Sequence, residues 1–229
     1  MNDQVRSCAN DSTPAHLTHS LALARAEGYA LGIKLVRGAY HPLELAAHQL
    51  ARSITSSTSP TESSSSHHLH LSISPDLEPP LQSSKKATDQ CYDACAALLV
   101  DAISSDIQRS GRSGAPGVGV MFGTHNWTSS EFILQEIVKK GLGTTKRAGG
   151  DEVPDSEEVV RIPLEVGERI TFSQLYGVLS FSARCGIMLT DIGMSDALTN
   201  HLVWRMRSEA PCVLKYVPYG ALVEVSLFI

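Results

Sequence analysis

Side chains that could bind or transform a ligand gather at four points, each directly after an apolar run typical of a buried strand. The first run begins at Gly32, carries Lys34, and ends in Arg37-Gly38-Ala39-Tyr40. The other three points follow the same pattern: Thr124-His125-Asn126, Gln174-Leu175-Tyr176-Gly177 and Lys215-Tyr216-Val217-Pro218-Tyr219-Gly220. In parallel α/β folds, ligands bind at the carboxyl ends of strands. Taken alone, the first stretch fits equally well an ordinary strand that leaves the core with a solvated lysine and arginine.

Helical patterns separate these strands. Ser12 or Thr13 can cap a first helix that Gly28 closes, and a short helical segment runs to about Leu50. Further helices are predicted over 87–108, from about 131 to 140, and onward from a cap at Ser195 or Asp196. They alternate with strands predicted at 33–36, 118–123, 169–173 and 212–217. This order predicts parallel strands with covering helices, about the last four βα units of a partial (β/α)8 TIM-type barrel.

Two segments interrupt the alternation. Residues 51–86 are dense in serine and proline, a composition that buries too little apolar surface to offset the entropy of ordering. We expect a disordered insertion there, although long loops in compact domains are often functional and a lid remains an alternative. Residues 143–167 are Gly-rich and then acidic, and we expect a surface excursion.

Composition excludes some classes of partner. The chain has 229 residues with a formal net charge of −5, which gives no reason to expect nucleic acid as a partner. No apolar run approaches the ~20 residues of a membrane span. The five cysteines are not spaced as metal ligands, so no metal site is expected. The first residues, Met-Asn-Asp-Gln-Val, match neither a signal peptide nor an Arg-rich transit peptide, which indicates a cytosolic protein or an N-terminus that lies elsewhere.

The four strand ends together resemble the successive motifs of proline dehydrogenase (proline oxidase), particularly its fungal mitochondrial members. The resemblance covers roughly 13–48, 87–142 and 166–225. It implies an FAD-containing (β/α)8 barrel that oxidises L-proline to 1-pyrroline-5-carboxylate in proline catabolism. It also implies electron transfer to a membrane quinone, a mitochondrial location, and inner-membrane association of the full-length enzyme. On this basis residues 1–229 are predicted to form one partial barrel domain.

The resemblance assigns the cofactor to seven residues. Lys34 would stand beside flavin N5 and O4, where bacterial members usually have arginine, and its cation would stabilise the reduced flavin. His125 would donate or accept a hydrogen bond rather than transfer a proton, and Gln174 would bond the pyrimidine edge. The full cofactor set is Lys34, Val36, Gly38, Thr124, His125, Asn126 and Gln174.

The resemblance also assigns the substrate side. Tyr40 would form a wall of the proline site, Leu175 would pack against the substrate ring, and Tyr216 matches a pocket tyrosine. With Lys34, these residues form the predicted catalytic set.

The chain departs from the family pattern in three places. Four strands are counted where closure of a barrel needs eight. Residues 178–193 separate Gln174–Gly177 from Gly193-Met194-Ser195-Asp196, as an in-frame retained intron would. The Tyr-Leu-x-Arg-Arg helix, whose arginines would clamp the proline carboxylate, has no counterpart in the sequence. These departures give an alternative expectation: a catalytically inactive fragment of such an enzyme, from a truncated or mis-spliced gene model.

Overall fold

The computed structural model describes residues 2–7, 13–37, 45–50, 52–53, 81–82, 84–111, 114–147, 158–175, 180–181, 188–189 and 192–216. For 2–7, 147, 175, 180–181, 188–189, 192–196 and 216 it describes the backbone alone. Within these ranges, no helix is both long enough and apolar enough to cross a membrane.

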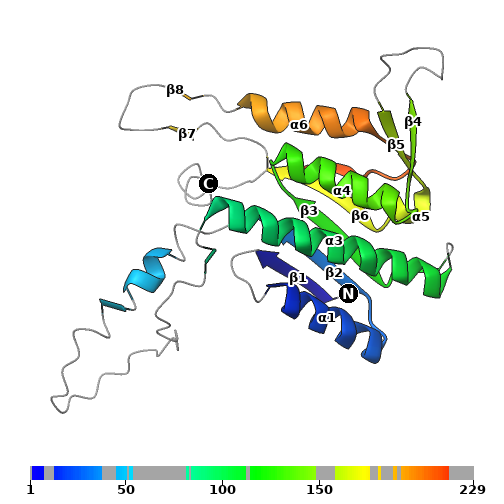
Figure 1. Ribbon diagram of the computed structural model, residues 1–229, viewed down its shortest axis with the longest axis horizontal. Coiled ribbons are helices and arrows are strands. Elements are labelled where there is room, and N and C mark those ends of the chain that lie inside the picture. The colour runs from blue at the N-terminus through cyan, green and yellow to red at the C-terminus, as the bar shows by residue number, and fades with distance from the viewer. Residues whose placement is uncertain are drawn as a thin grey trace.

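A five-stranded sheet organises the fold (Figure 1). Its strands lie in the order β1-β2-β3-β6-β10, and every neighbouring pair is parallel. Their bounds are Asn2–Ser7 for β1, Leu31–Val36 for β2, Val118–Gly123 for β3, Ile170–Leu175 for β6 and Val213–Tyr216 for β10. The carboxyl ends of all five therefore lie along one edge, as the alternation of helices and strands predicted, and the fold is mixed α/β of a kind compatible with a partial TIM-type barrel.

The helices lie on one side of this sheet (Figure 1). They are α1 (Thr13–Glu27), α3 (Lys85–Ser110), α4 (Trp127–Lys139) and α6 (Ile192–Arg205). Alternate strand residues point toward them, and these form the core with the inner faces of the helices. Core members from the strands include Leu31, Ile33, Leu35, Val118, Val120, Phe122, Ile170 and Phe172.

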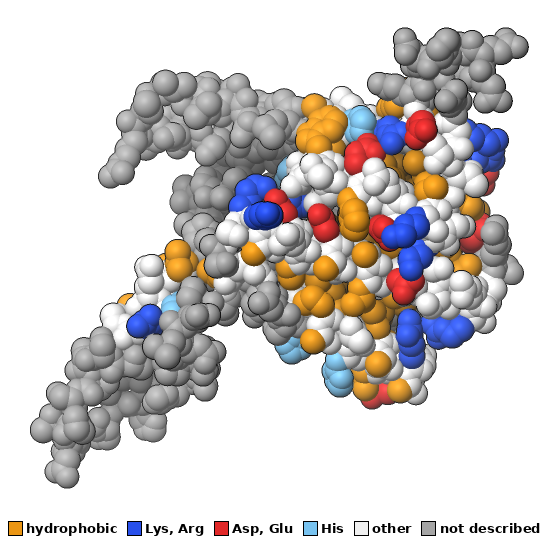
Figure 2. Space-filling view, in the orientation of Figure 1, with side chains coloured by type: hydrophobic (Ala, Val, Ile, Leu, Met, Phe, Trp, Pro, Cys, Tyr) orange, Lys and Arg blue, Asp and Glu red, His pale blue; other side chains and the backbone are white. Residues whose placement is uncertain are grey.

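The outer surface of the helices carries charges of both signs close together (Figure 2). Lys85 pairs with Asp89 at 2.7 Å and Lys140 pairs with Asp101 at 2.6 Å. Because the signs alternate, this face presents no single-sign field that would attract a highly charged partner.

A second, smaller sheet lies where the sequence predicted a surface excursion over 143–167. It joins β4 (Thr144–Arg147), β5 (Glu158–Ile162) and β9 (Met206–Ser208), and a short helix α5 (Leu164–Gly167) follows β5. The prediction was wrong because the valine and isoleucine side chains of β5 are buried. The flanking glycines and acidic residues obscured this short apolar run.

Other boundaries also differ from the predictions. Five strands lie in the main sheet rather than four, since β1 is polar (NDQVRS) and gives no strand periodicity. Helix α4 begins at Trp127 rather than near 131, and α6 begins at Ile192 rather than after a cap at Ser195 or Asp196. Helix α3 begins at Lys85 with Ser84 as its N-cap, two residues before the predicted start.

The two interrupting segments fall largely outside the described residues. Within 178–193, the described part has two short antiparallel strands, β7 (Ser180–Phe181) and β8 (Met188–Leu189), and the first residues of α6. The expected disorder of 51–86 concerns residues outside the description, apart from 52–53, 81–82 and 84–86.

A buried ion pair holds the amino ends of β3 and β6 together. Asp106 of α3 accepts hydrogen bonds through Oδ2 from the backbone N–H groups of Gly117 and Val118, at 2.9 and 3.3 Å. Nε of Arg169 lies 3.5 Å from the same oxygen, and this arginine side chain is 0% exposed. The guanidinium also donates to the carbonyl oxygens of Glu165 and Gly114. Each charge is thus satisfied inside the core, as burial of an ion requires.

We predict that Asp106→Ala lowers the free energy of unfolding by about 3 kcal/mol, since it leaves the Arg169 cation and two strand N–H groups unpaired. Urea unfolding followed by circular dichroism measures the change. Asp101→Ala is the matched control on the same helix, because Asp101 is exposed and pairs only at the surface. Equal stabilities of the two variants would contradict the role assigned to Asp106.

Candidate functional site

The carboxyl edge of the sheet has two faces, and the predicted residues divide between them. On β2, Lys34 and Val36 alternate with the core residues Ile33 and Leu35, so they lie on the face away from the helices. Lys34 is directly opposite Met121 on β3, and Val36 is opposite Gly123. Residues one position further along, Arg37 and Thr124, return to the helix side.

On the face away from the helices, a pair of glycines lies two residues before Lys34, toward the amino ends of β2 and β3. Gly32 and Gly119 are direct partners on β2 and β3. A Cβ added to Gly119 would meet no atom within 4 Å, so there is open space above the backbone. A ligand can approach the backbone closely at Gly119, because this residue carries no side chain.

Arg37 joins four elements at the helix side of the edge, and the sequence analysis gave it no role. Its guanidinium pairs with Asp89 of α3 (Nη1 to Oδ1, 2.6 Å) and donates through Nη2 to the hydroxyls of Thr124 (3.1 Å) and Ser129 (2.6 Å). It also lies over the ring of Tyr92, 4.6 Å from the centroid, a cation–π contact. The Arg37 side chain is 13% exposed. The only sequence signal for Arg37 was its position three residues before Tyr40, in a stretch already rich in polar and aromatic side chains.

The carboxylate of Asp89 stays ionised beside this arginine. Burial raises the pKa of Asp89, but hydrogen bonds and charge from Lys85 and Arg37 outweigh it, and the net shift is downward. The ion pair is therefore present throughout the neutral range.

Thr124, His125 and Asn126 form the turn from β3 into α4. Asn126 is the N-cap of α4: its Oδ1 accepts from the N–H groups of Thr128 and Ser129, at 2.9 and 3.3 Å. Asn126 suits this role because its side-chain acceptor reaches the N–H groups at both N2 and N3. The amide side chain predicted to contact a flavin is therefore already engaged through its oxygen.

His125 has its imidazole at the surface. The protein atoms around it still exclude part of its hydration, and this desolvation lowers the pKa of the ring. A lowered pKa favours the neutral imidazole, which suits the predicted hydrogen-bonding role.

Gln174 lies inside β6 on the helix side, 0% exposed. Its Oε1 accepts a hydrogen bond from Thr199 of α6 at 3.1 Å, while its Nε2 is buried with no partner among the described residues. A buried amide with one unpaired end is costly, and a ligand acceptor at this edge would satisfy it.

The remaining predicted residues are placed only in part. Leu175 and Tyr216 are partners in the last register pair of β6 and β10, next to the pair of Gln174 and Lys215. Gly38 and Tyr40 lie outside the described residues.

Helices α4 and α6 are joined beside this edge by Glu131. Arg205 donates to both of its oxygens (Nε to Oε1, 3.2 Å; Nη2 to Oε2, 2.9 Å), and Nε2 of His201 lies 2.7 Å from Oε1. The Trp127 ring packs on the His201 ring with centroids 4.8 Å apart. The hydrogen bond from Arg205 is the largest influence on the pKa of Glu131 and lowers it, partly offset by burial.

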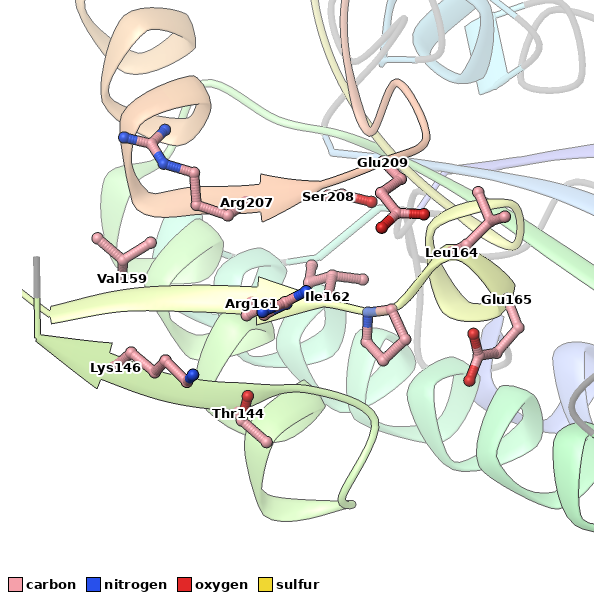
Figure 3. A pocket seen from close by; sticks show the side chains of 11 residues that line it. Thr144, Lys146, Val159, Arg161, Ile162, Leu164, Glu165, Arg207, Ser208 and Glu209 are labelled. Atoms are coloured by element: carbon pink, nitrogen blue, oxygen red, sulfur yellow. The ribbon is translucent and has the colours of Figure 1, made fainter.

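A groove of about 950 Å³ lies elsewhere, between the small sheet and α5 (Figure 3). Basic side chains from the sheet strands, Lys146 and Arg161, stand at one part of it, and Glu165 and Glu209 at another (Figure 3). Glu165 precedes β6 and Glu209 precedes β10, so this groove is near the amino ends of those strands. No residue of the predicted cofactor and catalytic sets lines it.

Comparisons with known proteins support the fold. No family model matches the chain. A CutC family protein of Caulobacter vibrioides is 36% identical over 88 residues, 37% of this chain and 35% of that protein. This match spans too little of either protein to define a family.

Among solved structures, proline utilization A (PutA) from Bdellovibrio bacteriovorus, inactivated by N-propargylglycine, has a TM-score of 0.58 and 15% identity over 99% of this chain. The chain spans 15% of the length of that protein. PutA from Bradyrhizobium japonicum has a TM-score of 0.47 and 18% identity over 93% of this chain. At such low identity the similarity to the first structure establishes the fold alone.

We predict that Glu131→Gln lowers the free energy of unfolding at pH 7 by about 1 kcal/mol, an amount reduced by solvent screening because the pair is partly exposed. Because folding lowers the pKa of Glu131, its contribution is present above the ordinary value of 4.5 and is lost as the pH falls through the folded-state value. The difference between variant and wild type should therefore narrow below pH 4.5. Chemical denaturation between pH 7 and pH 3 measures this difference in unfolding free energy. Glu168→Gln, at an exposed position, is the control. A difference between Glu131→Gln and wild type that does not change with pH would contradict the prediction.

Proposed function

We propose that this chain carries the flavin- and proline-binding part of an FAD-dependent oxidoreductase that converts L-proline to 1-pyrroline-5-carboxylate. The observation that carries the proposal is the common edge of β2, β3, β6 and β10, the strands that lead into four motifs far apart in the sequence. Similarity in fold to a PutA structure supports it.

Two separate features of the sheet suit parts of a flavin. On the face away from the helices, Gly119 leaves open space above the backbone. On the helix side, near the carboxyl end of β6, Gln174 has a buried amide nitrogen without a partner among the described residues. A flavin bound at this sheet would supply the two-electron oxidation. It would accept a hydride from proline, and the C–N bond of the proline ring would become C=N. Lys34 would place a cation beside the ring, where negative charge develops on reduction.

Other residues would position the cofactor and substrate. Val36 and Gly38 would let the ring approach β2, and Thr124, His125 and Asn126 would bind it from the end of β3. Tyr40, Leu175 and Tyr216 would enclose the proline ring and exclude water. A quinone would accept the electrons, and the full-length fungal-type enzyme would work at the mitochondrial inner membrane in proline catabolism.

A chain of the same fold that does not turn over proline is the second candidate. It is favoured by the described strands, which form an open sheet with β1 and β10 at its edges rather than a closed barrel. An open sheet leaves the face that carries Lys34 accessible to water, whereas a flavin dehydrogenase must exclude it.

We expect purified chain mixed with FAD to show a protein-bound flavin spectrum that bleaches when L-proline is added without oxygen. Lys34→Ala should slow bleaching on the order of 100-fold, because it removes a cation that stabilises charge in the transition state. Lys34→Arg keeps the cation and should remain within about tenfold of wild type.

Exposed Lys140→Ala is the control, since Lys140 caps the carboxyl end of α4 and pairs with Asp101 of α3. Bound flavin that L-proline does not bleach would favour the second candidate. Bleaching that is equally fast in Lys34→Ala would remove Lys34 from the catalytic set.

A further inference from the structure

We propose that Arg37 is a positioning residue that makes the hydroxyl of Thr124 a hydrogen-bond donor toward the flavin ring. The identity of the acceptor rests on the proposed function, whereas the orientation of Thr124 rests on contacts within the chain.

The oxygen of Thr124 already accepts two hydrogen bonds. One comes from Nη2 of Arg37 at 3.1 Å, and the other from the backbone N–H of Asn126 at 3.0 Å. A hydroxyl has two lone pairs and one proton, so both acceptor positions are filled and only the proton is left to give. Among the described residues none accepts it. Thr124 is 4% exposed, which makes an unused donor there costly.

Arg37 is itself held from three other directions. Asp89 pairs with Nη1, Ser129 accepts from Nη2, and the Tyr92 ring supports the plane of the guanidinium. Four fixed contacts leave the arginine one orientation, and this orientation sets the rotation of the Thr124 hydroxyl. A guanidinium can do this because its donors lie in a rigid planar fork, which a lysine lacks.

The same contacts fix the end of β2. Arg37 directly follows Val36, the last residue of the strand, and bonds across to Thr124, which directly follows β3. This bond adds a side-chain link to the backbone ladder, whose last pair is Val36 and Gly123.

Four variants test the proposal: Thr124→Val, Thr124→Ser, Arg37→Met and the double variant Arg37→Met/Thr124→Val. Fluorescence titration measures the affinity for FAD, and amide hydrogen exchange by NMR measures protection at Asn126 in the protein without flavin. Thr124→Val should weaken FAD binding about five- to tenfold, the effect of one hydrogen bond, and Thr124→Ser should restore it.

Arg37→Met should weaken FAD binding at least as much as Thr124→Val, and it should speed exchange at Asn126. If Arg37 acts through Thr124, the double variant binds FAD no more weakly than Arg37→Met alone, because coupled residues do not add. Additive losses, or wild-type affinity in Thr124→Val, would overturn the proposal. Lys140→Ala is the control for both measurements.

Failure of the proposed function gives a different result. If the wild-type chain does not bind FAD, the proposed function is contradicted, but hydrogen exchange at Asn126 still tests the positioning role of Arg37. Faster exchange at Asn126 in Arg37→Met supports the positioning role, and unchanged exchange overturns it.

Discussion

One constraint governs the molecule: a parallel sheet carries its helices on a single face. Parallel strands put every carboxyl end on one edge, and strict alternation sends successive side chains to opposite faces. Leu35 of β2 and Phe122 of β3 are 0% exposed against the helices, and this burial fixes the register of both strands. A slip of one residue would move these side chains out of the core and Lys34 into it. The face on which each described candidate residue of β2 and β3 lies follows from this requirement.

Arg169, which is fully buried, and Arg37, which is 13% exposed, hold opposite ends of the sheet, and the two have different kinds of partner. Arg169, at the amino end, is paired with Asp106 and otherwise bonds backbone carbonyls, so its contacts serve the fold alone. Arg37, at the carboxyl end, bonds the hydroxyls of Thr124 and Ser129 as well as a carboxylate. A hydroxyl that accepts a hydrogen bond from a cation still has a proton to donate to a ligand, whereas a carbonyl has no proton to donate. Ligand binding is therefore possible at the end that Arg37 holds.

The sequence predicted the fold where apolar periodicity was strong and failed where it was weak. The runs that became β2, β3 and β6 were recognised from their buried valine, leucine, isoleucine and phenylalanine residues. Strand β1 was missed because it has one apolar residue, and β5 because its three buried residues lie behind an acidic segment. Propensity cannot locate such strands, since pairing with neighbours far along the chain stabilises them.

The same difference in signal applies to the site. Residue types at strand ends pointed to Lys34, Thr124 and Gln174, but they carried no information on which face each would occupy. Arg37 had the sequence neighbourhood of a site residue, yet its role depends on Asp89 and Ser129, 52 and 92 positions away. The sequence analysis assigned Asn126 to the cofactor, whereas in the structure its side-chain oxygen caps α4. Contacts of this range exist only after the sheet has formed.

The division between faces also bears on the size of the ligand. Lys34 lies on the open face, while Thr124 and Gln174 lie on the helix side of the edge. Lys34 is paired with Met121, and Thr124 lies three residues further along the chain, which is about 10 Å along the strand direction. One ligand that meets both must cross the edge between β2 and β3 at Gly123, where a Cβ would lie 3.0 Å from Cγ1 of Val36. A free amino acid is too short for this path, so Lys34 and Thr124 can serve one site only if a larger cofactor connects them.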